Sequence, residues 1–216
     1  MNCFSNKRIG IIVVSVLLLT AALFLFIIWE GSRIIDTSIP LTDERIAEVL
    51  DANSYTSPEQ RKVVESAVSL VGRVSYFWGG KYDGLGEDPD WGKPRTVTSE
   101  GSPSTGTVIP WGLDCSGYVT WAFIQAGYTA SEIGHGTWNQ WFASEEIALE
   151  DVVPGDLVFV SPYPGSSGNH VGIVIGYADD KPVAAHCSSA YNNVVVTYIE
   201  DNFNYARRPI LRNNAD

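Results

Sequence analysis

The chain has 216 residues, which is enough for one domain of ordinary size and an additional segment. Its formal net charge is −11, and after Trp29 it carries 12 basic residues against 25 acidic ones. This balance argues against nucleic acid or anionic lipid surfaces as the main partner, because both bind clustered Lys and Arg. Three cysteines are too few for a secreted domain built around a disulfide framework.

Residues 9–29 contain no charged side chain and are almost wholly apolar, which is long enough for one membrane-spanning helix. Lys7 and Arg8 precede this run, so we expect residues 1–8 in the cytoplasm and the rest of the chain outside the cell. We interpret residues 9–29 as an uncleaved signal-anchor of a single-pass membrane protein. The alternative is a cleaved signal peptide, but no small-x-small cleavage site follows Trp29.

Residues 30–56 are interpreted as a stalk with one short amphipathic helix, whose apolar face carries Ile46, Val49 and Leu50. The folded domain is predicted to span residues 57–212. It opens on a helix over residues 58–72, with Ser57 as N-cap, proline at the first helical position and Gln60 as the capping-box residue.

Residues 81–112 form a long segment rich in glycine, proline, serine, threonine and aspartate. A connection of this length inside a compact domain is usually functional or disordered. Trp91 and Trp111 lie within it and favour a structured lid.

Residues 113–117 read Leu-Asp-Cys-Ser-Gly and open an apolar helical pattern that ends at Gly127. Cys115 therefore stands at a helix N-terminus, where unpaired N–H groups and the helix dipole favour the thiolate. This position makes Cys115 a candidate nucleophile. Asp114 has two interpretations, a contact with substrate or the N-cap of this helix.

The C-terminal half reads as four strands, over residues 156–161, 170–177, 183–187 and 194–199. Helices followed by an antiparallel meander predict an α+β fold. His170 starts the second of these strands and His186 lies near the end of the third, so the two imidazoles should lie close together. A thiol, an imidazole base and a polar group that orients the base are what nucleophilic acyl transfer requires.

Two alternatives concern the thiols. Cys115 and Cys187 could form a disulfide, and Cys115, His170, His186 and Cys187 could together bind zinc, although paired spacing such as C-x-x-C is absent. Cys187 should point away from His186 into the core, because side chains alternate along a strand. His135 has no assigned role.

Four segments in order resemble the motifs of the NlpC-type cysteine peptidases, which are papain-like bacterial cell-wall endopeptidases. They are residues 76–80 (YFWGG), 114–117 (DCSG), 155–159 (GDLVF) and 170–173 (HVGI). The resemblance implies Cys115 as nucleophile, His170 as general base and His186 as the orienting residue, with no metal or other cofactor. It further implies that the Tyr76 hydroxyl and the Cys115 N–H stabilise the oxyanion.

The resemblance also implies the substrate, the peptide stem of peptidoglycan, usually cut between D-γ-glutamate and the diamino acid. We expect contacts with this stem from Trp78, Trp111, Asp114 and Ser116. The insertion at 81–112 is longer than is usual for the family and should shape one wall of the cleft. With the anchor, these expectations describe an outward-facing hydrolase on the membrane of a Gram-positive cell. The alternatives are a catalytically silent murein-binding or scaffolding domain, and an amidase or acyltransferase.

Overall fold

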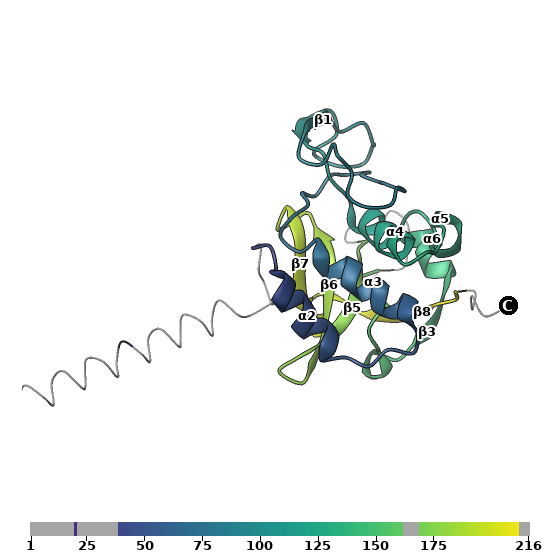
Figure 1. The fold of residues 1–216 in the computed structure, drawn as a ribbon. Coiled ribbons are helices and arrows are strands. Elements are labelled where there is room, and N and C mark those ends of the chain that lie inside the picture. The colour runs from purple at the N-terminus through teal and green to yellow at the C-terminus, as the bar shows by residue number, and fades with distance from the viewer. Residues whose placement is uncertain (1–19, 21–38, 162–168, 212–216) are drawn as a thin grey trace, which may run out of the picture. The chain divides into compact units, whose positions relative to one another are not determined.

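The computed structural model describes Thr20, residues 39–161 and residues 169–211. The predicted signal-anchor, residues 9–29, lies outside this range except for Thr20. Within the described residues, no helix has both the length and the apolar character needed to span a bilayer. The residues described from 39 onward belong to one compact unit (Figure 1).

The centre of this unit is a six-stranded antiparallel sheet with the order β3-β8-β4-β5-β6-β7. Its strands are β3 (Ser144–Ile147), β4 (Leu157–Phe159), β5 (Val171–Ala178), β6 (Lys181–Ser188), β7 (Asn193–Tyr198) and β8 (Tyr205–Pro209). Strands β4 to β7 form the predicted meander. The sequence did not predict β3 and β8, which extend the sheet beyond β4.

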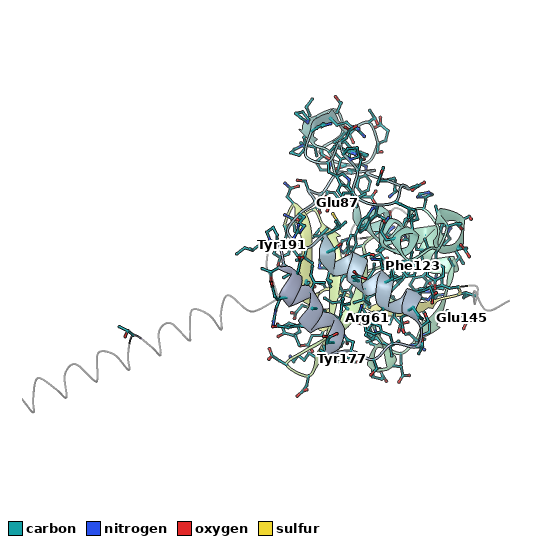
Figure 2. The ribbon with its side chains drawn as sticks, in the orientation of Figure 1. Arg61, Glu87, Phe123, Glu145, Tyr177 and Tyr191 are labelled. Carbon is teal, nitrogen blue, oxygen red and sulfur yellow. The ribbon has the colours of Figure 1, made fainter. Side chains whose placement is uncertain are left out.

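Helices pack on this sheet in the α+β arrangement that the sequence predicts (Figure 1). The longer ones are α2 (Asp43–Asp51), α3 (Pro58–Ser69) and α4 (Cys115–Gln125). The short ones are α5 (Ala130–Ile133), α6 (Thr137–Phe142), the 3-10 turn η1 (Leu149–Asp151) and α7 (Ile199–Asn202). Both α3 and α4 contact β5 and β6, with Arg61 exposed on α3 and Phe123 buried in α4 (Figure 2).

The start of α3 follows the prediction, with one difference. The Ser57 side chain accepts the Gln60 N–H at 3.1 Å, as expected for an N-cap. The Gln60 side-chain oxygen accepts from the Thr56 N–H at 2.6 Å rather than from Ser57, and its amide donates to the Pro154 carbonyl at 2.8 Å. Gln60 therefore ties α3 to the turn before β4. The helix ends at Ser69, three residues before its predicted end, and Gly72 follows with φ +73°.

The segment predicted as a stalk packs against the domain from residue 39 onward. Its predicted short helix is α2, with Thr42 as N-cap. Leu41 and Leu50 are buried, and the Asn53 amide donates to the Ile175 carbonyl of β5 at 3.0 Å. The packed body therefore begins before residue 57, because Leu50 of α2 and Leu41 just before this helix are buried against it.

The insertion, residues 81–112, is structured, as its tryptophans suggested. It contains a two-stranded sheet of β1 (Pro94–Thr96) and β2 (Val108–Pro110). Strand β1 lies at the top of Figure 1. Val97 and Trp111 of the insertion form a buried cluster with Phe77, which precedes it, and Trp78, Trp91 and Ile109 pack around them.

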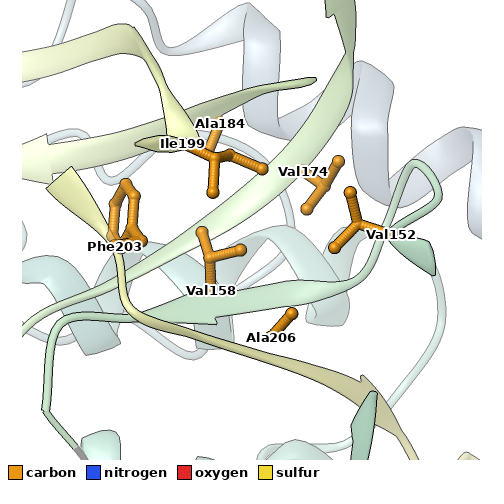
Figure 3. Close-up of a cluster of buried hydrophobic side chains, with 7 residues drawn as sticks. All are labelled: Val152, Val158, Val174, Ala184, Ile199, Phe203 and Ala206. Atoms are coloured by element: carbon orange, nitrogen blue, oxygen red, sulfur yellow. The ribbon is translucent and has the colours of Figure 1, made fainter. Parts of the chain in front are cut away.

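The two faces of the main sheet bury different clusters. Figure 3 shows the cluster on one face, which consists of Val152, Val158, Val174, Ala184, Ile199, Phe203 and Ala206. On the other face the Cys187 thiol donates to the carbonyl of Leu113, just before α4, at 3.1 Å. Alternation along β6 therefore directs Cys187 toward α4 and places His186 on the face of Phe203.

Candidate active site

Cys115 is the first residue of α4, as the sequence predicts. The Asp114 carboxylate caps this helix by accepting the Gly117 N–H at 2.7 Å, and the Asp114 N–H donates to the Gly80 carbonyl at 3.1 Å. A Cβ on Gly117 would lie 2.1 Å from that carbonyl oxygen. Glycine at position 117 therefore lets the chain at Gly80 dock directly against the first turn of α4.

The residue Cys115 is 7% exposed, and burial raises the pKa of its thiol to about 12. The Asp114 carboxylate raises this pKa further, whereas Lys81 and the N–H groups of Val171 and Ser116 lower it. The helix N-terminus was expected to lower the pKa of this thiol, but the loss of hydration on burial raises it by more. At neutral pH the group is a thiol, and a base must remove its proton before it can act as a nucleophile.

His170 and His186 lie together, as predicted, and form a chain of hydrogen bonds with Thr197. Nε2 of His170 lies 2.8 Å from Nδ1 of His186, and Nε2 of His186 lies 3.1 Å from Oγ1 of Thr197. If each imidazole is protonated on Nε2, His170 donates to His186 and His186 donates to Thr197. This tautomer leaves Nδ1 of His170 as the ring nitrogen that can accept a proton from a thiol.

The sheet register explains how the two histidines meet. Ile173 pairs with Ala185 across β5 and β6, so the next position places Gly172 beside His186. A Cβ on Gly172 would lie 3.2 Å from the Cβ of His186 and 3.1 Å from the Phe203 ring. The space left by this glycine is occupied by Phe203, whose ring stacks on His170 with centroids 5.8 Å apart and meets His186 edge-on at 5.3 Å.

Both imidazoles are neutral at physiological pH. Burial lowers the pKa of His170 to about 4, although the Asp114 carboxylate opposes this shift. Burial also lowers the pKa of His186 to about 3, and the neighbouring His170 contributes in the same direction. A neutral imidazole keeps a lone pair, so His170 has the protonation state that a general base requires.

Tyr76 lies next to the residues that lead into α4. It bridges to Leu113 in parallel, and the Phe77 N–H donates to the Leu113 carbonyl at 2.9 Å. Burial raises the pKa of the Tyr76 hydroxyl well above its usual value, and negative charge at Cys115 or Asp114 raises it further. The hydroxyl is therefore protonated and can donate a hydrogen bond, which is what the predicted oxyanion role needs.

Asp114 and Ser116 are bound to each other and to Lys81, a residue that the sequence interpretation did not single out. The Lys81 ammonium lies 2.5 and 2.6 Å from the two Asp114 oxygens and 2.6 Å from Oγ of Ser116. Oγ of Ser116 also donates to Asp114 at 2.8 Å. The N-cap interpretation of Asp114 is confirmed. A contact of Asp114 or Ser116 with substrate stays a prediction.

Comparison with known proteins identifies the group to which this site belongs. Residues 73–208 match the model of the NlpC/P60 family, and this range contains Tyr76, Cys115, His170 and His186. The chain belongs to the NlpC/P60 family.

Several NlpC/P60 relatives are similar over part of the chain. A probable endopeptidase of Mycobacterium tuberculosis is 35% identical over 99 residues, which are 44% of this chain and 23% of that protein. The bifunctional muramidase/DL-endopeptidase CwlT of Bacillus subtilis is 35% identical over 90 residues, which are 38% of this chain and 26% of that protein. The chain thus spans about a quarter of the length of these curated relatives.

Two solved structures from Mycobacterium tuberculosis are also similar to this NlpC/P60 chain. The peptidoglycan hydrolase RipB has a TM-score of 0.49 and 22% identity, over 80% of this chain and 70% of that one. RipD, described as a non-catalytic NlpC/p60 domain protein adapted to peptidoglycan binding, has a TM-score of 0.49 and 15% identity, over 72% of this chain and 99% of that one.

The two tryptophans predicted to contact substrate, Trp78 and Trp111, lie near the two ends of the insertion in this NlpC/P60 domain. Trp111 is 8% exposed, its Nε1 donates to the Asp88 carboxylate at 2.7 Å, and the Arg95 guanidinium lies 3.8 Å from its ring centroid. Trp78 is partly exposed and donates to the Glu100 carbonyl at 2.9 Å. Both indoles hold the insertion in place, and their contact with substrate stays a prediction.

The remaining predictions concern the thiols and His135. Cys115 and Cys187 are both free thiols, so the alternative of a disulfide between them is wrong. Across residues 39–161 and 169–211, no group of three or more His, Cys, Asp or Glu is arranged to hold a metal ion. His135, which had no assigned role, lies 3.1 Å from the Asp83 carboxylate at the surface.

Thr197 and Phe203 are site residues that sequence reasoning missed. Thr197 directly follows three valines in β7, and that contrast could have drawn attention to it. Phe203 follows α7, where no periodic pattern marks it.

Proposed function

We propose that this domain is a cysteine endopeptidase that hydrolyses peptidoglycan stem peptides through an acyl-enzyme. The observation that carries the proposal is the chain of hydrogen bonds from His170 to His186 to Thr197. Its tautomer leaves Nδ1 of His170 able to take the proton of a thiol at the start of α4. Membership of the NlpC/P60 family and the endopeptidase names of the curated relatives support the same chemistry.

In the first half of the reaction, Sγ of Cys115 attacks the carbonyl carbon of the scissile amide while its proton passes to Nδ1 of His170. The Cys115 N–H and the Tyr76 hydroxyl donate to the oxyanion that forms. The imidazolium is held through its Nε2–H by His186. Its Nδ1 proton then moves to the leaving amine, so the C–N bond breaks and a thioester remains.

In the second half, His170 takes a proton from water as the water oxygen attacks the thioester carbonyl. The proton returns to sulfur as the C–S bond breaks, and a carboxylic acid is released. Buried neutral histidines suit both halves, because the imidazolium exists only while charge is developing on the reacting atoms.

The expected bond joins D-γ-glutamate to the diamino acid of the stem peptide. Purified muropeptides incubated with the protein should give products with a new free amine on the diamino acid, identified by mass spectrometry. Release of intact stem peptide from glycan would show an amidase instead. Transfer of the acyl group to an added amine in preference to water would show an acyltransferase. Binding of muropeptides without any cleavage would show the silent scaffold.

We infer that residues 9–29 anchor the protein in the cell membrane with its catalytic domain outside. The support is the uncharged apolar run and its flanking Lys7 and Arg8. In Gram-positive cells from which the wall has been removed but whose membrane is intact, added protease should digest the domain. The protein should stay with membranes in high salt. A domain protected from protease, or released into the medium with a new N-terminus after residue 29, would contradict the anchor.

A further inference from the structure

Lys81 is the first residue of the insertion, and its side chain reaches the start of the catalytic helix. Its ammonium contacts both oxygens of Asp114 and the hydroxyl of Ser116, at 2.5 to 2.6 Å. These three contacts account for the three donors of an ammonium group. The backbone beside it is fixed as well, because the Gly80 carbonyl accepts the Asp114 N–H at 3.1 Å.

Asp114 gives the site an electrostatic problem. Its carboxylate caps α4, yet it is buried next to the thiol that must become negative during the reaction. A nearby negative charge disfavours a second one, and a buried carboxylate without a partner is strongly destabilising. An Asn could cap the helix without bringing a charge to this position. With Asp, the cost of burying the carboxylate must be offset by a partner of opposite charge. Lys81 is that partner.

We propose that Lys81 is a positioning residue for the reaction at Cys115: it holds Asp114 in its capping position and cancels the charge of that carboxylate. Through Lys81, its first residue, the insertion therefore acts on the nucleophile directly. This effect is in addition to the side of the substrate cleft that the insertion is expected to form. The consequence for peptide cleavage rests on the proposed endopeptidase activity. The effect on the thiol does not, because it is a property of the protein without substrate.

The direction of the pKa shifts agrees with this assignment. The Asp114 carboxylate raises the pKa of the Cys115 thiol, and the Lys81 ammonium lowers it. Removing Lys81 alone should therefore leave an uncompensated carboxylate and make the thiol harder to ionise. Removing the Asp114 charge alone should leave an uncompensated ammonium and make the thiol easier to ionise.

The test is the rate at which iodoacetamide alkylates Cys115 in the full chain, followed between pH 6 and 10 by mass spectrometry of the peptide that contains it. Below its pKa a thiol is ionised about tenfold less for each unit by which the pKa rises. We expect Lys81→Met to slow alkylation by about tenfold, and Asp114→Asn to accelerate it. The double variant Lys81→Met/Asp114→Asn should return toward the parent rate.

Lys93→Met is the matched control, because Lys93 belongs to the same insertion and pairs with Asp90 at the surface. It should alkylate at the parent rate. Lys81→Arg retains the charge and should stay closer to the parent than Lys81→Met. Thermal unfolding of each variant establishes that it is folded. If Lys81→Met does not fold, the acceleration expected for Asp114→Asn decides the question alone.

The proposal would be overturned by a folded Lys81→Met protein that alkylates like the parent, or by an Asp114→Asn protein that alkylates no faster than the parent. A double variant as slow as Lys81→Met would show a purely structural tether and would overturn it too. Failure of the endopeptidase proposal is a separate outcome. It would appear as absent muropeptide cleavage in a parent protein whose alkylation rates still follow the expected order.

Discussion

The two halves of the candidate site are controlled by different physical means. The nucleophile side, at the start of α4, contains an ion pair between Lys81 and Asp114 within hydrogen-bond distance of Ser116. The base side, on β5, β6 and β7, consists of two neutral imidazoles, the Thr197 hydroxyl and the Phe203 ring. Burial shifts the pKa of the thiol and of both imidazoles, but the thiol also lies under the opposing charges of Asp114 and Lys81. The thiol is therefore sensitive to charge as well as to burial, whereas the imidazoles depend mainly on burial and orientation. Changes on each side should have different signatures.

The largest effect on the base side is expected from His170→Ala. General-base catalysis contributes about 10²- to 10⁴-fold, so kcat/KM for muropeptide cleavage should fall by at least about a hundredfold. His135→Ala is the control, since His135 lies at the surface against Asp83. A His170→Ala protein with more than about a tenth of the parent activity would show that another group removes the proton.

A graded loss should follow along the relay. His186→Ala removes the partner of Nε2 of His170 and should lower kcat by about a hundredfold, because the imidazolium loses its orientation and its acceptor. Thr197→Val keeps the shape of a side chain that is 2% exposed and should lower kcat by about tenfold or less. Both should change kcat more than KM. A larger loss for Thr197→Val than for His186→Ala would contradict the order of the relay.

Burial of neutral histidines also predicts how activity and stability depend on pH. The pKa values of about 4 for His170 and about 3 for His186 lie below the usual value of 6.5. Activity should fall as pH falls through about 4, because a protonated His170 cannot accept the thiol proton. Between these values and about pH 6.5 the unfolded chain binds protons that the folded chain does not, so stability should decrease as pH decreases.

The contribution of each imidazole is about 1.4 kcal/mol per pH unit across that window. Denaturant unfolding between pH 7 and 4 measures how the free energy of unfolding changes with pH. His186→Gln should reduce this slope by the contribution of about one proton. An activity profile that falls instead near pH 6.5 would place His170 in a solvated environment and would contradict the account of the base side.

The smallest effect on activity is expected for Ser57, which belongs to neither side of the site. Ser57→Ala removes the N-cap of α3 and should lower the free energy of unfolding by about 1 kcal/mol, with kcat/KM unchanged. Denaturant unfolding and muropeptide cleavage measure the two quantities. A loss of activity as large as that of Thr197→Val would show that α3 positions site residues directly, which would contradict a site made of only the nucleophile side and the base side.

Features encoded by local patterns were predicted from the sequence. The helix that begins at Cys115 and the cap at Ser57 depend on neighbours within a few residues, and the meander β4 to β7 joins strands that follow one another in the chain. The pairing of His170 with His186 followed from the adjacency of two consecutive strands. In contrast, β8 reads Tyr-Ala-Arg-Arg-Pro and carries little strand signal, because its pairing with β3 and β4 comes from distant parts of the chain.

Features that depend on tertiary contacts were not predicted. Lys81 is 33 residues from Asp114, and nothing in the sequence around Lys81 indicates that its side chain returns to α4. The expectation of a thiolate was reversed by burial, which a sequence does not report for a helix N-terminus. The packing of α2 against the domain depended in the same way on where Leu41 and Leu50 are buried.

The most direct test of the central claim compares the two buried cysteines in a muropeptide cleavage assay. Cys115→Ala should abolish product formation to the level of a blank. Cys187→Ser, which keeps a donor for the Leu113 carbonyl in the same core, should retain activity within about threefold of the parent. Cleavage by Cys115→Ala at the parent rate would contradict the assignment of Cys115 as the nucleophile.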